Sequence, residues 1–183
     1  MATSRIAPLD PPYAEDIAAG FARVMPPGRA PLKLFRTLAH NPRVLSRLFA
    51  GGLLDRGAVT LAEREIVILR ACARAGGEYE WGVHVTFFSD RAGLSPSCVD
   101  ATVLGRAEDP AFDADQRLLI RLVDSLHDTA DIGDGLWNDL SERWEKPALI
   151  ELIMLAGQYR MIGTLCRGLR VAREPDAAVF PER

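Results

Sequence analysis

The sequence predicts an all-α protein, a helical bundle built around an antiparallel pair of helices. Apolar residues recur at helical spacing in most segments, and no alternating pattern of useful length predicts a β-strand. Two capping-box patterns, Thr60 with Glu63 and Asp113 with Gln116, mark the starts of helices. At 183 residues the chain is long enough for one sizeable core and short for two independent domains. We therefore expect a single domain over residues 1–183.

The N-terminal part of the chain is expected to hold an arm followed by three helices. Residues 1–12 are rich in proline and small polar side chains, which is typical of an extended arm that wraps a neighbouring subunit. Pro26-Pro27-Gly28 ends the first helix, and Asn41 caps the third, with Pro42 in its first turn. The three helices are expected over residues 13–25, 30–38 and 42–54.

The rest of the chain is expected to be helical up to a loose tail. Gly76-Gly77 allows the helix that starts at Leu61 to fold back against the next one, which should end near Gly93. The tail over residues 174–183 follows a proline-containing break and carries no helical pattern, so we expect it to be loose. The helices after the pair are expected over residues 96–104, 113–126, 136–144 and 147–170.

Three ionisable side chains mark the helical pair as a candidate site. At about 100° per residue, Glu65 falls on the apolar face of its helix. Glu80 and His84, four residues apart, share the aromatic face of the following helix with Trp81 and Phe88. If the helices fold together, the Glu65 carboxyl should come within hydrogen-bonding reach of the His84 ring. A carboxylate beside an imidazole raises the pKa of the imidazole toward the working pH, and this prepares the ring to act as a general acid or base.

The same residues also have structural interpretations. Glu65 can be a buried acid satisfied by an arginine or a helix end, and Glu80 with His84 can be a pair on a helix surface. A metal site is weakly indicated, because two carboxylates and one imidazole lack the further His or Cys that is typical of zinc. His40 and His127 have no comparable neighbours and are interpreted as surface histidines.

Charge and cysteine usage disfavour several classes of function. The net charge of −3 offers no basic stripe for nucleic acid and no polybasic segment for a membrane. Cys72, Cys98 and Cys166 fit neither a disulfide framework nor a zinc site, and are interpreted as small core residues. The first 16 residues lack the segments of a secretory signal, so we expect a cytoplasmic protein. The most apolar stretch, residues 147–165, is interrupted by polar residues and is expected to be a central helix rather than a membrane span.

The run from Leu61 to Ser95 resembles the core helical hairpin of the carboxymuconolactone decarboxylase family, which includes alkylhydroperoxidase D and its relatives. The resemblance implies an alkylhydroperoxidase D-like helical bundle. In the peroxidase branch a glutamate precedes a Cys-x-x-Cys pair, and a histidine follows four residues after the second cysteine. Counted back from His84, the glutamate is Glu65, but the two cysteine positions are Gly77 and Glu80. This chain therefore resembles the branch that lacks the pair.

The resemblance implies a cofactor-independent lyase of aromatic-compound breakdown, which acts on a small carboxylated lactone or a related enolisable acid. In that reaction His84 would donate or shuttle the proton. Glu80 would orient the His84 imidazole and favour its charged form, and Glu65 would act as a further relay. No nucleotide- or phosphate-binding motif is present, so no organic cofactor and no metal is expected. The candidate substrate-binding residues are Trp81, Tyr79, Phe88 and Tyr159.

Two other functions stay open at this point. One is a thiol-linked peroxidase or antioxidant protein, against which the missing cysteines count. The other is a helical oligomer that binds a small ligand without chemistry. For each of the three functions we expect a small-molecule partner, no nucleic acid and no membrane. We also expect a homo-oligomer, either a dimer or a hexamer built as a trimer of dimers. The expected interface is the helix over residues 147–170, which is apolar in nearly every direction.

Overall fold

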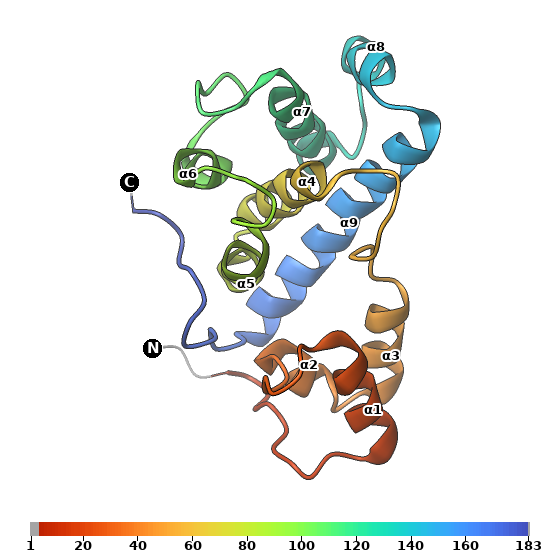
Figure 1. Cartoon of the computed structure of the whole chain (residues 1–183), viewed down its shortest axis with the longest axis vertical. Helices are drawn as coiled ribbons and strands as arrows, with labels where there is room; N and C mark the ends of the chain where they lie inside the picture. The colour runs from red at the N-terminus through yellow and green to blue at the C-terminus, as the bar shows by residue number, and fades with distance from the viewer. Residues whose placement is uncertain (1–3, 183) are drawn as a thin grey trace.

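A computed structural model describes residues 4–182, and over these residues the backbone is helical without a strand (Figure 1). The all-α expectation is confirmed. Residues 1–3 of the expected arm and residue 183 of the expected tail lie outside the described residues. The helices are α1 (Glu15–Val24), α2 (Lys33–Leu38), α3 (Pro42–Ala50), α4 (Leu61–Arg74), α5 (Glu78–Phe88), α6 (Pro96–Leu104), α7 (Ala114–Thr129), α8 (Asp134–Arg143) and α9 (Lys146–Leu169).

Helices α4 and α9 pack side by side at the centre of the molecule (Figure 1). Helix α4 packs against α5, α6, α7 and α9, and every residue from Arg64 to Cys72 is buried. Helices α1 to α3 gather at one end, and α8 lies beside α7 at the other. Fully burying one Leu or Ile side chain stabilises a fold by about 1.5–3 kcal/mol. Ile66, Leu69, Leu122 and Leu155 are completely buried in this core.

The start of α4 and its turn into α5 follow the sequence signals. Thr60 and Glu63 form the expected capping box: the Thr60 N–H donates to the Glu63 carboxylate at 2.7 Å, and the Glu63 N–H donates to Thr60 Oγ1 at 3.3 Å. Gly76 adopts a positive φ of 64°, a conformation that glycine reaches without strain. The next N–H, of Gly77, donates to the Cys72 carbonyl at 2.7 Å. The chain therefore turns back at the expected glycine pair.

Helix α9, with 24 residues, is the longest of the described helices. By length and composition it meets the criterion for a membrane span, with a mean hydropathy of 1.2 over 18 residues. The sequence analysis had instead predicted a central helix of the fold. It packs against α4, α5, α7 and α8, and 44% of that window is buried in the fold. The core helix of a globular bundle meets the same criterion. Its outer face carries exposed apolar side chains, namely Ile150 (69% exposed), Met154 (54%) and Met161 (48%).

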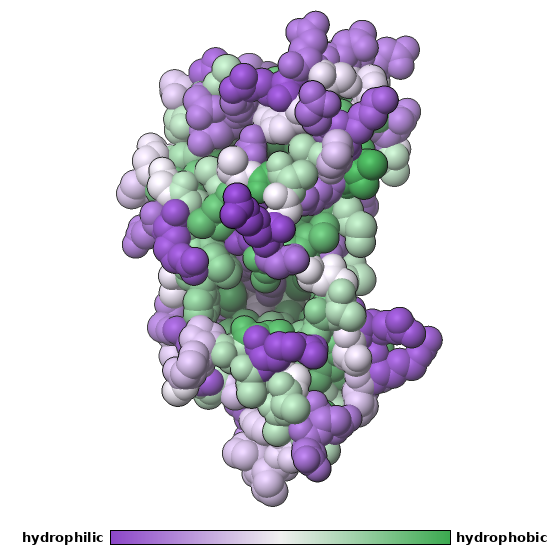
Figure 2. Space-filling model, turned by 45° about the vertical axis from the view of Figure 1, so that its right-hand side comes forward, coloured by the Kyte–Doolittle hydropathy of each residue, from purple (hydrophilic) through white to green (hydrophobic). Residues whose placement is uncertain are grey.

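That outer face borders a hollow between α9 and the N-terminal helices. A groove of about 580 Å³ is lined from α3 by Val44 and Leu48 and from α9 by Met154, Gln158 and Met161. Figure 2 shows a hollow in the corresponding face of the molecule, with apolar side chains around it. One subunit thus leaves apolar surface uncovered along its central helix.

Residues 4–12 of the expected arm lie against their own chain. The Arg5 N–H donates to the Leu169 carbonyl at 2.9 Å. Further along, the Leu9 N–H donates to the Arg36 carbonyl at 3.2 Å, and Arg36 Nε donates to the Leu9 carbonyl at 2.7 Å. The arm therefore ties α2 to the end of α9.

The C-terminal tail is held across α5 and is not loose as expected. The Tyr79 hydroxyl donates to Glu174 at 2.6 Å, and the Ala178 N–H donates to Thr86 Oγ1 at 3.0 Å. Gly82 makes this path possible, because a Cβ at this position would lie 2.1 Å from the Ala178 carbonyl oxygen. A tail without helical pattern is thus fixed by contacts that only the folded chain provides.

Candidate active site

Glu65, His84 and Glu80 come together between α4 and α5. His84 Nδ1 lies 2.7 Å from Glu65 Oε2, so the predicted direct contact is present. On the other side of the ring, Nε2 lies 3.6 Å from Glu80 Oε1. All three side chains are buried, with residue exposures of 2%, 0% and 7% for His84, Glu65 and Glu80. The imidazole is thus held between two carboxylates inside the fold.

Arg64 completes the cluster, and the sequence analysis missed it. Its Nε donates to Glu65 Oε1 at 3.0 Å, and its Nη1 donates to the Leu54 carbonyl at 2.7 Å. The guanidinium carbon lies 5.5 Å from the centre of the Phe88 ring, within the range of a cation–π contact. Arg64 therefore neutralises and orients Glu65. With His84 protonated, two cations balance two carboxylates, which reduces the free-energy cost of burying them.

The two carboxylates control the charge of His84. Burial lowers the pKa of the ring, but the hydrogen bond to Glu65 and the neighbouring Glu80 outweigh burial and raise it to about 9. We assign the larger share to Glu65, because Glu80 at 3.6 Å is beyond hydrogen-bond length and acts through its charge. The sequence analysis had given that role to Glu80. At neutral pH the ring is an imidazolium with a proton on each nitrogen.

Glu80 keeps an unused acceptor in this site. Its Oε2 atom is buried and makes no hydrogen bond within residues 4–182. A buried oxygen without a partner costs roughly 1–3 kcal/mol, so this position favours a ligand that can donate a hydrogen bond. Glu65 and Glu80 face opposite nitrogens of His84, and the described residues contain no cluster of three His, Cys, Asp or Glu arranged for a metal ion.

Two of the four aromatic candidates flank His84. The Tyr159 ring, from α9, meets the imidazole edge-on with centroids 4.9 Å apart, and the Phe88 ring lies at 5.2 Å, tilted by 32°. Burial and the charge of Glu80 raise the pKa of Tyr159 well above its ordinary value, so its hydroxyl stays neutral. These rings exclude water from the imidazole and strengthen its electrostatic contacts.

The other two candidates are engaged away from His84. Trp81 Nε1 donates to Thr102 Oγ1 at 3.0 Å, and its ring packs edge-on against Phe180 at 5.3 Å. The Tyr79 hydroxyl accepts a hydrogen bond from the Leu34 N–H at 3.0 Å and donates to the tail. Trp81 and Tyr79 thus hold α5 to its surroundings. The expectation that they line the site is not supported by these contacts.

The position of the first family cysteine is closed by packing. A Cβ at Gly77 would lie 2.9 Å from the Cα of Gly163 in α9, closer than real Cβ atoms approach. The cysteines of this chain lie elsewhere and are buried and free. Burial and Glu80 raise the pKa of Cys72, and burial raises that of Cys98 to about 11. A thiolate nucleophile is therefore not favoured at either position.

The fold and the hairpin define a class, the alkylhydroperoxidase D-like helical proteins. The chain aligns with the crystal structure of an alkylhydroperoxidase AhpD core, an uncharacterized peroxidase-related protein from Ralstonia eutropha JMP134, at a TM-score of 0.80 and 16% identity, over 93% of this chain and 94% of the other. A peroxidase-related protein from Silicibacter sp. TM1040 aligns at 0.77 and 16% identity, over 92% and 90%. The debrominase Bmp8 aligns at 0.70 and 15% identity, over 93% and 92%. At such identities the likeness shows the fold alone.

The family follows from the sequence. Residues 42–122 match the model of the carboxymuconolactone decarboxylase family. The match runs from the start of α3 into α7 and contains Glu65, Glu80 and His84. No curated protein matches the chain. The resemblance found in the sequence is confirmed at the level of the family and its fold.

Proposed function

We propose that the protein is a cofactor-independent enzyme of the carboxymuconolactone decarboxylase type, in which His84 is the general acid. The observation that carries the proposal is the imidazolium held between Glu65 and Glu80, with a pKa of about 9, in a buried site. A site of this kind supplies a proton to a carbanionic intermediate. The expected substrate is a small carboxylated lactone or a related enolisable acid.

The proposed reaction uses His84 Nε2 as the proton donor. When the bond between the substrate carbon and its carboxylate breaks, carbon dioxide leaves and the electron pair stays in a dienolate. Nε2 then gives its proton to carbon, and the ring recovers a proton from solvent. Glu65 holds Nδ1 throughout, which fixes the orientation of the ring. Glu80, whose Oε2 has no hydrogen-bond partner within residues 4–182, would accept a hydrogen bond from the substrate.

Access to the site needs a local opening. His84 is 2% exposed, and neither the groove between α3 and α9 nor three other cavities in the described residues are lined by Glu65, Glu80 or His84. The proposal therefore requires a side chain such as Phe88, which lies over the ring, to move when substrate binds. The same closure favours a second candidate function, a helical ligand-binding oligomer in which the buried cluster only stabilises the fold.

A redox function is the less favoured alternative. Some proteins of the same fold are described as peroxidase-related, and one is a debrominase. In this chain position 77 has no room for a side chain, and position 80 is a carboxylate. Turnover of an alkyl hydroperoxide with a dithiol donor would favour this alternative over the decarboxylase.

The test is release of carbon dioxide from carboxymuconolactone in deuterated water, followed by the incorporation of deuterium into the product. We expect His84→Gln to lower kcat by about 10²–10⁴, the usual contribution of a general acid. His127→Gln is the matched control, because His127 lies at the end of α7, away from the cluster. No release by the wild-type protein, or full activity of His84→Gln, would refute the proposal. Loss of stability without any activity to lose would favour the ligand-binding alternative.

A further inference from the structure

A separate cavity lies where the start of α5, the end of α9 and the tail meet. Its volume is about 710 Å³. Cationic side chains from three separate segments line it, together with two carboxylates. The cations are Lys33 from α2, Arg167 from α9, and Arg170 and Arg173 from the segment that follows α9; the carboxylates are Glu78 and Glu174.

Among the described residues, the four cations of this cavity have no carboxylate partner. None of them forms an ion pair within the part of the chain from residue 4 to residue 182. Lys33 Nζ donates to the Arg173 carbonyl at 2.5 Å, and Arg167 Nη1 donates to the Ala75 carbonyl at 3.3 Å. A neutral carbonyl orients a cation but leaves its charge uncompensated.

The two carboxylates of the cavity are occupied by neutral donors. Glu174 accepts hydrogen bonds from the Tyr79 hydroxyl at 2.6 Å and from the Lys33 backbone N–H at 2.5 Å. Glu78 accepts from the Phe180 N–H at 3.0 Å. Both acids are thus used to anchor the tail, and they face N–H and O–H groups instead of the guanidinium groups.

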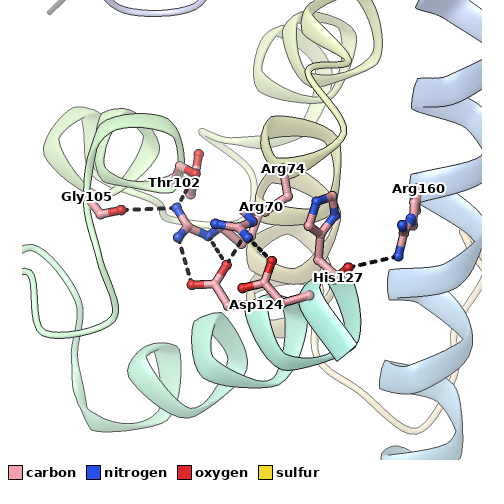
Figure 3. Close-up of polar contacts among 8 residues, drawn as sticks. Arg70, Arg74, Thr102, Gly105, Asp124, His127 and Arg160 are labelled. Atoms are coloured by element: carbon pink, nitrogen blue, oxygen red, sulfur yellow. Dashed lines mark hydrogen bonds and ion pairs between the residues drawn. The ribbon is translucent and has the colours of Figure 1, made fainter. Parts of the chain in front are cut away.

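Arg70 and Arg74, by contrast, are paired with acids. In the cluster between α4 and α7, Arg70 makes two hydrogen bonds of 2.8 Å with the Asp124 carboxylate and also donates to the carbonyls of Thr102 and Gly105 (Figure 3). Arg74 lies 3.5 Å from the same carboxylate. These cations are compensated by acids within the chain. The cavity at the start of α5 lacks such compensation.

We propose that this cavity binds a small oxyanion with at least two negative charges, such as a phosphate group or a dicarboxylate. Four cations against two carboxylates leave a local excess of two positive charges, in a chain whose net charge is −3. Arginine forks match the oxygens of phosphate and carboxylate groups. The N-terminus of α5, an 11-residue helix that begins at Glu78, adds its positive dipole end to the same cavity. The site is independent of the chemistry at His84.

Isothermal titration with inorganic phosphate and with succinate, at constant ionic strength, tests the proposal. We expect the wild-type protein to bind at least one of the two anions. The double variant Arg167→Gln/Arg170→Gln should bind it at least about tenfold more weakly, because each removes a charged hydrogen-bond donor. Arg160→Gln is the matched control: Arg160 also lies on α9 and donates Nη1 to a backbone carbonyl, that of His127, at 3.1 Å.

The outcomes separate the two anion classes and also test the site itself. Binding of phosphate alone identifies a phosphate site, and binding of succinate alone identifies a dicarboxylate site. If neither anion binds the wild-type protein, or if Arg160→Gln weakens binding as much as the double variant, the proposal is wrong. Circular dichroism checks that the variants fold. Lys33→Gln, which removes the cation that α2 contributes, gives a second test and should also weaken binding.

Discussion

Replacing Glu65 by glutamine should lower the free energy of unfolding more than the same replacement at almost any other carboxylate of the protein. Glu65 is fully buried and accepts hydrogen bonds from Arg64 at 3.0 Å and from His84 at 2.7 Å. The amide keeps the shape but removes the charge that compensates both cations. Removing one partner from a buried ion pair costs about 3–5 kcal/mol, because the other charge is left buried without compensation. We expect a loss of this size in the free energy of unfolding at pH 7.

Urea unfolding followed by circular dichroism measures this loss. The matched control is Glu142→Gln, in an exposed position of α8, which should change the free energy of unfolding by no more than about 0.5 kcal/mol. His84 should also become neutral near pH 7 in the Glu65 variant, since its strongest partner is gone. If Glu65→Gln cost less than about 1 kcal/mol, the inference that Glu65 compensates two buried cations would be refuted.

Three further predictions follow from the same contacts. The folded pKa of His84, about 9, lies above its unfolded value of 6.5; its contribution to stability, on the order of 3 kcal/mol, is therefore complete below about pH 6.5 and is lost as pH rises through about 9. Urea unfolding of wild type and His84→Gln across this range should show the difference, and parallel curves would contradict it. Gly82→Ala should displace the tail at Ala178 and expose it to limited proteolysis. Gly135→Ala, whose Cβ would meet no atom within 4 Å, should leave the tail protected. Equal cleavage of the two variants would show that Gly82 does not control the position of the tail. The protein should form a homo-oligomer through the exposed face of α9, and light scattering of wild type and Met154→Glu should show a larger species that the variant dissociates; a wild-type mass near 20.1 kDa would contradict this.

The local part of the fold was predictable from the sequence, because its signals lie within one helical turn. The Thr60 capping box places the start of α4 at Leu61, and the Asp113 capping box places the start of α7 at Ala114, as observed. With the register of α4 fixed, the burial of Glu65 followed from the helical period. The contact with His84 then required only that α5 fold back at the glycine pair.

The rest of the site depends on contacts between distant segments. Arg64 directly precedes Glu65, yet its position is set by the Leu54 carbonyl in the preceding loop, which no periodic pattern reveals. Tyr79 was expected to be a polar residue of the substrate pocket. It instead bonds to Glu174 in the tail, 95 residues away. Helical spacing gives the face that a side chain occupies, and only the tertiary structure gives its partner.

The charge state of His84 is the central claim, and an NMR titration of the imidazole nitrogens tests it most directly. The chain has three histidines, His40, His84 and His127, and His84→Gln identifies the signal. Partial burial, together with Arg74 and Arg160, lowers the pKa of His127, so the pKa values of His84 and His127 should shift in opposite directions. We predict a midpoint of about 9 for His84. A midpoint at or below its ordinary value of 6.5 would contradict the account, because the ring would then be neutral at pH 7 and could not act as the acid.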